Sequence, residues 1–231
     1  MNAAAKHIEN SIFEKQNKEK ALWLENYVKH NIKSLGVGIP EIREIVIKTN
    51  HQFGIIKLSL PEQINFLNHL IQQPYTEYKL ATILYIQLFW SNMPSLAVLE
   101  LMSEWFDNKW INDWNVCDWL CVRIISPLLD TASGPVINEL TQWNNNAYLW
   151  KARASLVPFA QCKSIKNHIV QITEFSEKLI KREERFCKTA VGWVLREYSK
   201  IDATYVSDFL VQYNNWTTKE VIRNATKYFS K

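Results

Sequence analysis

Glycine and proline are scarce in this chain of 231 residues, which has 5 glycines and 7 prolines. A β-sandwich or β-barrel needs a turn every few residues and uses many of both at those turns, so their scarcity counts against that class. Pro40, Pro61, Pro94 and Pro135 each stand where a new periodic segment begins, which suits the first turn of a helix. The sequence therefore predicts an all-α protein.

Cysteine pairs and long apolar runs are also missing. The four cysteines form no CxxC pair, and nothing near the N-terminus resembles the apolar run of a signal peptide. No stretch approaches the roughly 18 consecutive apolar residues of a membrane-spanning helix. We therefore expect a soluble, cytoplasmic protein of a reducing compartment, with access to the chromosome and no membrane partner.

The motifs of metal and phosphate chemistry are absent too. The sequence has no glycine-rich phosphate loop, no GxSxG elbow and no HExxH pair. Cys117 and Cys121 stand one helical turn apart, but no histidine lies near them in the sequence, and free cysteines usually pack as small apolar residues. We expect no metal site and no other cofactor.

The net charge is small but unevenly distributed. The chain has 27 basic and 23 acidic residues, a formal net charge of +4 that permits a nucleic-acid partner without requiring one. Residues 178–200 carry seven basic residues against three glutamates. The basic residues of this stretch are Lys178, Lys181, Arg182, Arg185, Lys188, Arg196 and Lys200.

Apolar residues recur at helical spacing almost from end to end. The expected helices cover approximately 4–15, 18–33, 40–50, 61–72, 75–91, 94–107, 113–130, 134–143, 147–162, 164–180, 183–200, 202–213 and 217–229. Trp114, Trp150 and Trp193 fall 36 and 43 residues apart, close to the period of roughly 40–47 residues of HEAT-like units. We expect one domain over residues 1–231, a solenoid of HEAT-like antiparallel helix pairs.

A carboxylate interrupts the segment Trp114–Cys121, which is otherwise apolar on nearly every face. Asp118 lies one helical turn after Trp114, on the same side of the helix. Removing such an acid from water is costly unless it has a partner. Two interpretations stay open: Asp118 accepts bonds from a neighbouring helix end or pairs with an arginine, or it stabilises a developing cation between aromatic walls.

An arginine interrupts the apolar face of the next segment in the same way. Trp150, Arg153, Ala154 and Val157 lie along one stripe of a helix. The anion that Arg153 requires is either Asp118, in a structural ion pair, or a phosphate held by two bonds from the guanidinium.

A tryptophan lies among cations on the helix expected through residues 183–200. Trp193, Arg196 and Lys200 project together, opposite an apolar face. In one interpretation Arg196 caps Trp193 through a cation–π contact on an ordinary surface. In the other, which the basic stretch favours, the aromatic ring meets a base or sugar while its basic neighbours meet phosphates.

Together these motifs resemble the AlkD-type family of DNA alkylation repair enzymes, which are HEAT-like DNA glycosylases. The resemblance spans the chain and is most specific at its last motif. The similar segments are Asn17-Lys-Glu-Lys-Ala21, Tyr27, Leu35-Gly-Val-Gly-Ile-Pro-Glu-Ile-Arg43, Trp114-x-x-x-Asp118, Trp150-Lys-Ala-Arg153-Ala154 and Ala190-Val-Gly-Trp-Val-Leu-Arg-Glu-Tyr198. The chain departs from the family pattern at Asp113, where a second tryptophan is often found, and at Trp119.

The resemblance implies a solenoid with a concave basic face that binds double-stranded DNA containing alkylated purines. We expect a monomer, because the interacting face is then committed to DNA. It implies that Trp114 and Trp193 flank the sugar of the damaged nucleotide and that Asp118 lies beside its anomeric carbon. These three are the predicted catalytic residues. The activity would be that of a monofunctional glycosylase, which hydrolyses the N-glycosidic bond of cationic N3- or N7-alkylated purines without base flipping.

The predicted DNA contacts form a second group. The resemblance implies that Arg153 holds a backbone phosphate and that Tyr27 presses on the duplex from the N-terminal helices. Arg196 and Lys200 join them from the basic stretch.

Two other classes of function stay open. A catalytically silent DNA-structure-binding protein would bind DNA equally well after Asp118→Asn and would excise nothing before or after it. A protein-binding helical scaffold would lack the steep salt dependence that phosphate contacts confer on DNA binding.

Overall fold

The computed structural model describes residues 2–29 and 31–229, and no β-strand occurs among them. One isolated β-bridge joins Lys33 to Tyr75. The all-α prediction is confirmed. The α-helices are α1 (Asn2–Glu14), α2 (Lys18–Tyr27), α3 (Ile39–Phe53), α4 (Leu60–Ile71), α5 (Thr76–Phe89), α6 (Ser95–Asp107), α7 (Trp114–Leu120), α8 (Ser126–Thr131), α9 (Ser133–Asn144), α10 (Leu149–Leu156), α11 (Ile169–Ile180), α12 (Arg185–Tyr198), α13 (Ala203–Gln212) and α14 (Lys219–Ala225).

Most helices lie where the apolar periodicity predicts them, but some predicted bounds are wrong. The helix predicted over 18–33 ends at Tyr27, and the segment predicted over 164–180 begins with a 3-10 turn, Ile165–Asn167, before α11. Prolines divide two further segments. Between α7 and α8 the chain forms a π-helical turn, Cys121–Ile125, directly before Pro127. A 3-10 turn that contains Pro158, Val157–Ala160, follows α10. Because proline has no N–H to donate, the regular α-helical ladder cannot continue unchanged through either position.

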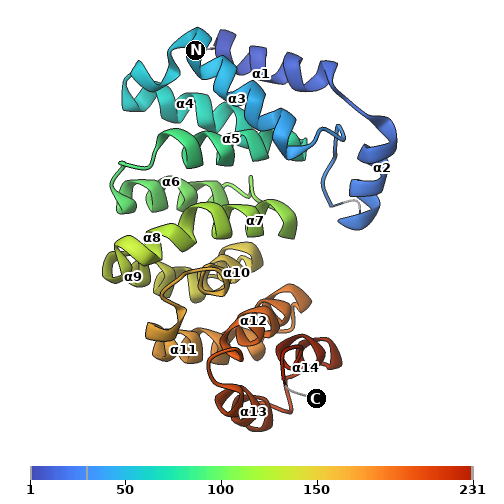
Figure 1. The fold of residues 1–231 in the computed structure, drawn as a ribbon, viewed down its shortest axis with the longest axis vertical. Helices are drawn as coiled ribbons and strands as arrows, with labels where there is room; N and C mark the ends of the chain where they lie inside the picture. Colours follow the sequence, from blue (N-terminus) through green and yellow to red (C-terminus); the bar gives the residue numbers. More distant parts are fainter. Residues whose placement is uncertain (1, 30, 230–231) are drawn as a thin grey trace. The chain divides into compact units, whose positions relative to one another are not determined.

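The chain divides into two compact units, Met1–Pro94 with Glu100–Trp119, and Ser95–Leu99 with Leu120–Lys231. In the first unit α1, α3, α4 and α5 pack on one another (Figure 1). Every residue of α5 from Thr76 to Ile86 is buried, which makes α5 the core helix of this unit. Its two charged residues, Glu77 and Lys79, are buried with the rest and are hydrogen-bonded.

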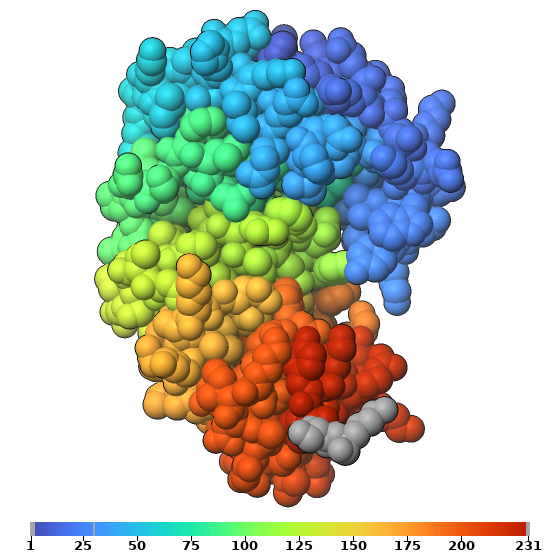
Figure 2. Space-filling view, in the orientation of Figure 1, coloured from blue at the N-terminus to red at the C-terminus, as the bar shows by residue number. Residues whose placement is uncertain are grey.

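Helix α2 stands apart from that layer of helices and buries none of its residues (Figures 1 and 2). Backbone contacts hold its N-terminal end. The N–H of Asn17 donates to the carbonyl of Leu35 at 2.8 Å. Gly36, with a φ of 74°, approaches so closely that a Cβ there would lie 2.1 Å from the Asn17 carbonyl oxygen. Only glycine fits at this contact.

Glu77 of α5 fixes the loop that holds α2. Its buried carboxylate accepts bonds from the Ser34 hydroxyl at 2.6 Å, the Leu35 N–H at 2.9 Å and the Gly36 N–H at 2.8 Å. Helix α2 is therefore attached to the core helix through a polar loop, and its side chains stay on the surface.

In the second unit α12 packs against α10, α11 and α14. Gly192 of α12 faces α14, and a Cβ at this position would lie 3.2 Å from the Cα of Val221. The glycine in the Ala190–Tyr198 motif thus allows the two helices to approach closely. Among the described helices none is long and apolar enough to cross a membrane. The single domain over residues 1–231, its HEAT-like pairing and its concave basic face stay predictions.

Candidate active site

The first unit contains three of the predicted site residues, and two of them are in contact. Trp114 and Asp118 lie one turn apart on α7, and both are half-buried. Tyr27, the last residue of α2, meets the Trp114 ring nearly edge-on, with centroids 5.1 Å apart and planes at 69°. The structure thus joins α2 to the helix that carries the predicted catalytic carboxylate.

Trp23 extends this contact and was missed by the sequence analysis. Its ring stacks parallel to that of Tyr27, with centroids 5.4 Å apart and planes at 5°. Trp23 is 65% exposed and Tyr27 is 56% exposed. The signal that could have found Trp23 is its spacing of four residues from Tyr27 on one helix. We call Trp23, Tyr27 and Trp114 the aromatic cluster; its exposed rings suit stacking on a base or sugar.

Asp113, at which the chain departs from the family pattern, caps the N-terminus of α7. Its Oδ1 accepts the N–H of Val116 at 3.0 Å, and the side chain is fully buried. Burial raises the pKa of this carboxyl to about 6; the N–H bonds and Lys79 oppose that shift, and the charge of Asp118 adds to it. The departure therefore has a structural role, which is to fix the start of the helix that carries Trp114 and Asp118.

Removal of this cap should destabilise the protein measurably. We expect Asp113→Ala to lower the free energy of unfolding by about 1–2 kcal/mol, the usual cost of losing a side-chain cap. Asp113→Asn keeps an oxygen acceptor without the buried charge, so it should be at least as stable as the wild type at pH 7. Urea denaturation of the three proteins measures both effects, and an Asn variant as unstable as the Ala variant would contradict the cap.

The difference in stability between the wild type and Asp113→Asn should depend on pH. The pKa of Asp113 rises from 3.8 to about 6 on folding, so the folded state binds the proton more tightly. The stabilisation that the folded state gains from this tighter proton binding is present in full below pH 4. It is lost as the pH rises to about 6. The stability of the wild type relative to Asp113→Asn should therefore fall across this range.

In the second unit Arg153 is held by the helix that carries Trp193. Arg153 is 5% exposed on α10, and Trp150, Ala154 and Val157 of its predicted stripe are buried with it. One guanidinium nitrogen donates to the Phe186 carbonyl at 2.6 Å and to the Thr189 hydroxyl at 3.2 Å, both on α12. These two bonds fix the direction of the guanidinium group. Whether its anionic partner is Asp118 or a phosphate stays open.

Trp193 and Arg196 lie on α12 as predicted, but α12 ends at Tyr198, so Lys200 lies in the turn that follows the helix. Trp193 is half-buried, and its Nε1 is buried without a hydrogen-bond partner among the described residues. Arg196 pairs with Glu197 at 2.7 Å, and Lys200 pairs with the same carboxylate at 2.5 Å. Both cations also lie over the ring of Tyr228, at 5.9 and 4.5 Å from its centroid. A phosphate would have to compete with Glu197, and the DNA contacts of Arg196 and Lys200 stay predictions.

A family model described as a DNA alkylation repair enzyme matches residues 8–229. The chain belongs to this family. A solved structure, a predicted DNA alkylation repair enzyme from Enterococcus faecalis, is similar with a TM-score of 0.79 at 18% sequence identity, over 94% of this chain and 97% of that one. At this identity the likeness shows the fold alone. Comparison with curated protein sequences gave no significant match.

Family membership confirms the resemblance drawn from the motifs and assigns the protein to the enzymatic repair of alkylated DNA. DNA is therefore its substrate. The match to the family model extends over both units. It includes Trp114 and Asp118 in the first unit and Arg153 and Trp193 in the second.

The basic stretch of this repair enzyme carries less free charge than its sequence indicates. Arg185 pairs with Glu220 at 2.6 Å, and Lys181 pairs with Glu177 at 2.9 Å; both acids come from outside residues 178–200. Arg182 pairs with Glu184 at 2.6 Å. Glu177 and Glu220 lie outside the stretch, so a count of charges within residues 178–200 omits them.

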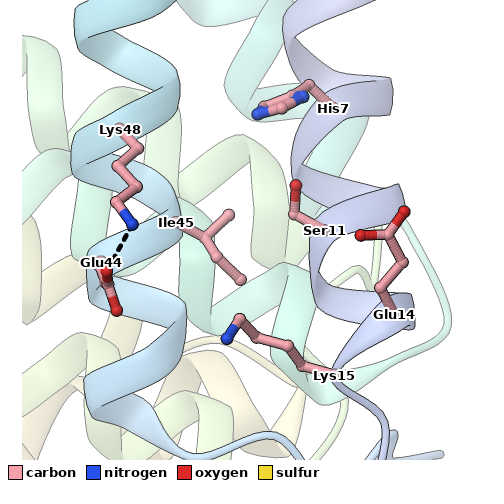
Figure 3. Close-up of a pocket in the computed structure, with 7 residues that line it drawn as sticks. All are labelled: His7, Ser11, Glu14, Lys15, Glu44, Ile45 and Lys48. Atoms are coloured by element: carbon pink, nitrogen blue, oxygen red, sulfur yellow. Dashed lines mark ion pairs between the residues drawn. The ribbon is translucent and has the colours of Figure 1, made fainter.

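The remaining candidate groups provide no alternative catalytic centre. Cys117 and Cys121 are buried, and the described part of the chain contains no group of three or more residues able to hold a metal ion. A pocket of about 200 Å³ in the first unit has His7, Glu14 and Lys15 in its wall, with Glu44 and Lys48 facing them from α3 (Figure 3). Glu44 and Lys48 pair with each other, so the charges in this pocket offset one another.

Proposed function

We propose that this enzyme is a monofunctional DNA glycosylase that removes cationic N3- or N7-alkylated purines from duplex DNA by hydrolysis of the N-glycosidic bond, without base flipping. The observation that carries the proposal is the arrangement of α7. Asp118 lies one turn after Trp114, and Trp114 in turn contacts Tyr27. A carboxylate beside aromatic rings suits a reaction in which positive charge develops on a sugar.

The chemistry follows from the charge of the lesion. An alkylated purine is already cationic, so when its bond to C1′ breaks, the bonding electron pair neutralises the base and positive charge moves to the deoxyribose. The departing base needs no proton. The Asp118 carboxylate would stabilise the sugar cation and orient the water that attacks C1′ and releases a proton. The π face of Trp114 would add to this stabilisation.

We assign the remaining roles to the second unit. Trp193 would provide a second aromatic surface to the deoxyribose, and Arg153 would hold a backbone phosphate. The support for Arg153 is its fixed direction, since the Phe186 carbonyl and the Thr189 hydroxyl orient the guanidinium from α12. An arginine held in this way has less freedom to lose on binding a phosphate than an unanchored one.

The monofunctional character has a direct test. The lysine in the motif of Trp150 and Arg153, Lys151, is buried, with its Nζ 6.0 Å from the Trp143 ring centroid, and is poorly placed to attack a sugar. Incubation with a duplex that contains one 7-methylguanine should yield the free base and an abasic strand that breaks only on later treatment with alkali. Borohydride should trap no covalent complex. A trapped complex, or strand cleavage that keeps pace with base release, would contradict this part of the proposal.

A further inference from the structure

A second pocket in the first unit is lined by three lysines. It has a volume of about 350 Å³, and its wall includes Lys33, Lys79 and Lys109 together with the side-chain amides of Asn31 and Asn112. Its described lining contains no aspartate or glutamate. A lining that combines three cations with amide donors and has no acidic residue is suited to an anion.

Lys79 forms the buried side of this pocket. It is 4% exposed, and its Nζ donates to the carbonyls of Ile71 and Trp110, each at 2.6 Å. An ammonium group has three N–H donors, so these two bonds leave one more for a ligand. Burial lowers the pKa of Lys79 to about 8, although the charge of Asp113 acts in the opposite direction. A bound anion would favour the charged lysine.

The pocket walls are fixed by the backbone. The N–H of Thr76 donates to the Lys33 carbonyl at 2.9 Å, which attaches the Lys33 segment to the start of α5. Lys109 has a φ of 59°, a left-handed turn that begins the loop before α7. The Trp110 carbonyl of this loop is one of the two acceptors of Lys79. The three lysines thus come from segments that are held in place without a ligand.

Two of these segments also carry the aromatic cluster. Lys33 follows Tyr27 by six residues, and Asn112 precedes Trp114 by two. Tyr27 and Trp114 contact each other. The segment that follows Tyr27 and the segment that precedes Trp114 both contribute residues to the pocket wall. A nucleotide that stacks on the aromatic cluster has a phosphate on either side of its sugar, and a phosphate is an anion that lysines and amide groups can bind.

We propose that the pocket of Lys33, Lys79 and Lys109 binds a phosphate of the DNA backbone beside the nucleotide that the aromatic cluster contacts. The identity of the ligand as DNA rests on the proposed function. None of the predicted DNA contacts includes these lysines. They place a phosphate-binding site in the first unit, separate from the basic stretch of α12.

Paired double variants test this site. Lys33→Gln/Lys109→Gln removes two charges from the pocket, and Lys15→Gln/Lys48→Gln removes two from the mixed-charge pocket of the same unit (Figure 3). All four lysines are exposed, so both variants should fold, which thermal unfolding checks. The dissociation constant for a duplex containing 7-methylguanine is then measured over a range of salt concentrations.

For the pocket variant we expect the slope of log affinity against log salt to become shallower by about 1, the change for one lost phosphate contact. The control variant should keep the slope of the wild type. Equal slopes in the two variants and the wild type would overturn the proposal and leave the proposed function intact. The expected slope change without base release by the wild type would support the pocket and contradict the glycosylase.

Inorganic phosphate, titrated into the free wild-type protein and followed by tryptophan fluorescence, separates the two sources of the anion. A DNA-backbone site should bind it only weakly, and the duplex should displace it. Tight binding of inorganic phosphate that the duplex does not displace would assign the pocket to a free phosphate compound and overturn the proposal.

Discussion

Replacement of Asp118 by asparagine should slow the release of 7-methylguanine at least about 100-fold, because one preorganised electrostatic contact is commonly worth a factor of 10²–10³ in rate. Asparagine keeps the size and shape of the side chain and removes its negative charge. The sugar cation then loses its counter-ion, and the attacking water loses its base. Binding of the duplex should change little, since the DNA contacts that we propose do not involve this carboxylate. Single-turnover release of the base and equilibrium binding measure the two effects separately.

A matched control is available in the same unit. Asp107, exposed at the end of α6, is another carboxylate whose replacement by asparagine removes one negative charge. Asp107→Asn should release the base at the rate of the wild type. If Asp118→Asn also did so, Asp118 would not be the catalytic carboxylate. If neither the wild type nor any variant released base while all bound DNA, the silent DNA-binding function would replace the proposed one.

The second large effect should be selectivity for charge on the lesion. We expect the enzyme to release 7-methylguanine at least 100 times faster than hypoxanthine from otherwise identical duplexes, as an order-of-magnitude expectation for a reaction without acid catalysis. Hypoxanthine is neutral and stable, so its departure requires a proton or strong contacts within a base pocket. A carboxylate that acts through its negative charge donates no proton, and two rings of the aromatic cluster, Trp23 and Tyr27, are exposed rather than enclosed in a pocket.

The measurement is single-turnover release from duplexes that differ only in the lesion, each corrected for spontaneous loss of the base without protein. Comparable corrected rates would require an acid and a pocket for an extruded base, and would rule out excision without base flipping. Binding affinities for the two duplexes should be similar, because backbone contacts are common to both.

Most of the fold could be predicted because its signals are local. Helical spacing of apolar residues located the helices, and the spacing of Trp114 and Asp118 was fixed as soon as their segment was helical. The interruptions at Pro127 and Pro158 were missed, since a continuous apolar pattern hides a change from α-helical to π-helical or 3-10 bonding. Asp113 was seen as a departure from the family pattern, but its role as a cap required the structure.

The parts of the site that could not be predicted depend on contacts between distant residues. The contact of Tyr27 with Trp114 depends on Glu77, whose carboxylate holds the loop that positions α2. The lysine pocket combines three segments that have no common pattern in the sequence. The charge of the basic stretch was overestimated because Glu220, one of its partners, lies on α14.

The most direct test of the central claim is the time course of 7-methylguanine release from duplex DNA by the wild-type protein, at saturating protein and low salt, beside the same duplex without protein. We predict a single exponential release of free base that is faster than spontaneous loss and leaves an intact abasic strand. Release no faster than in the protein-free control, from duplex shown to be fully bound, would contradict the assignment as a glycosylase.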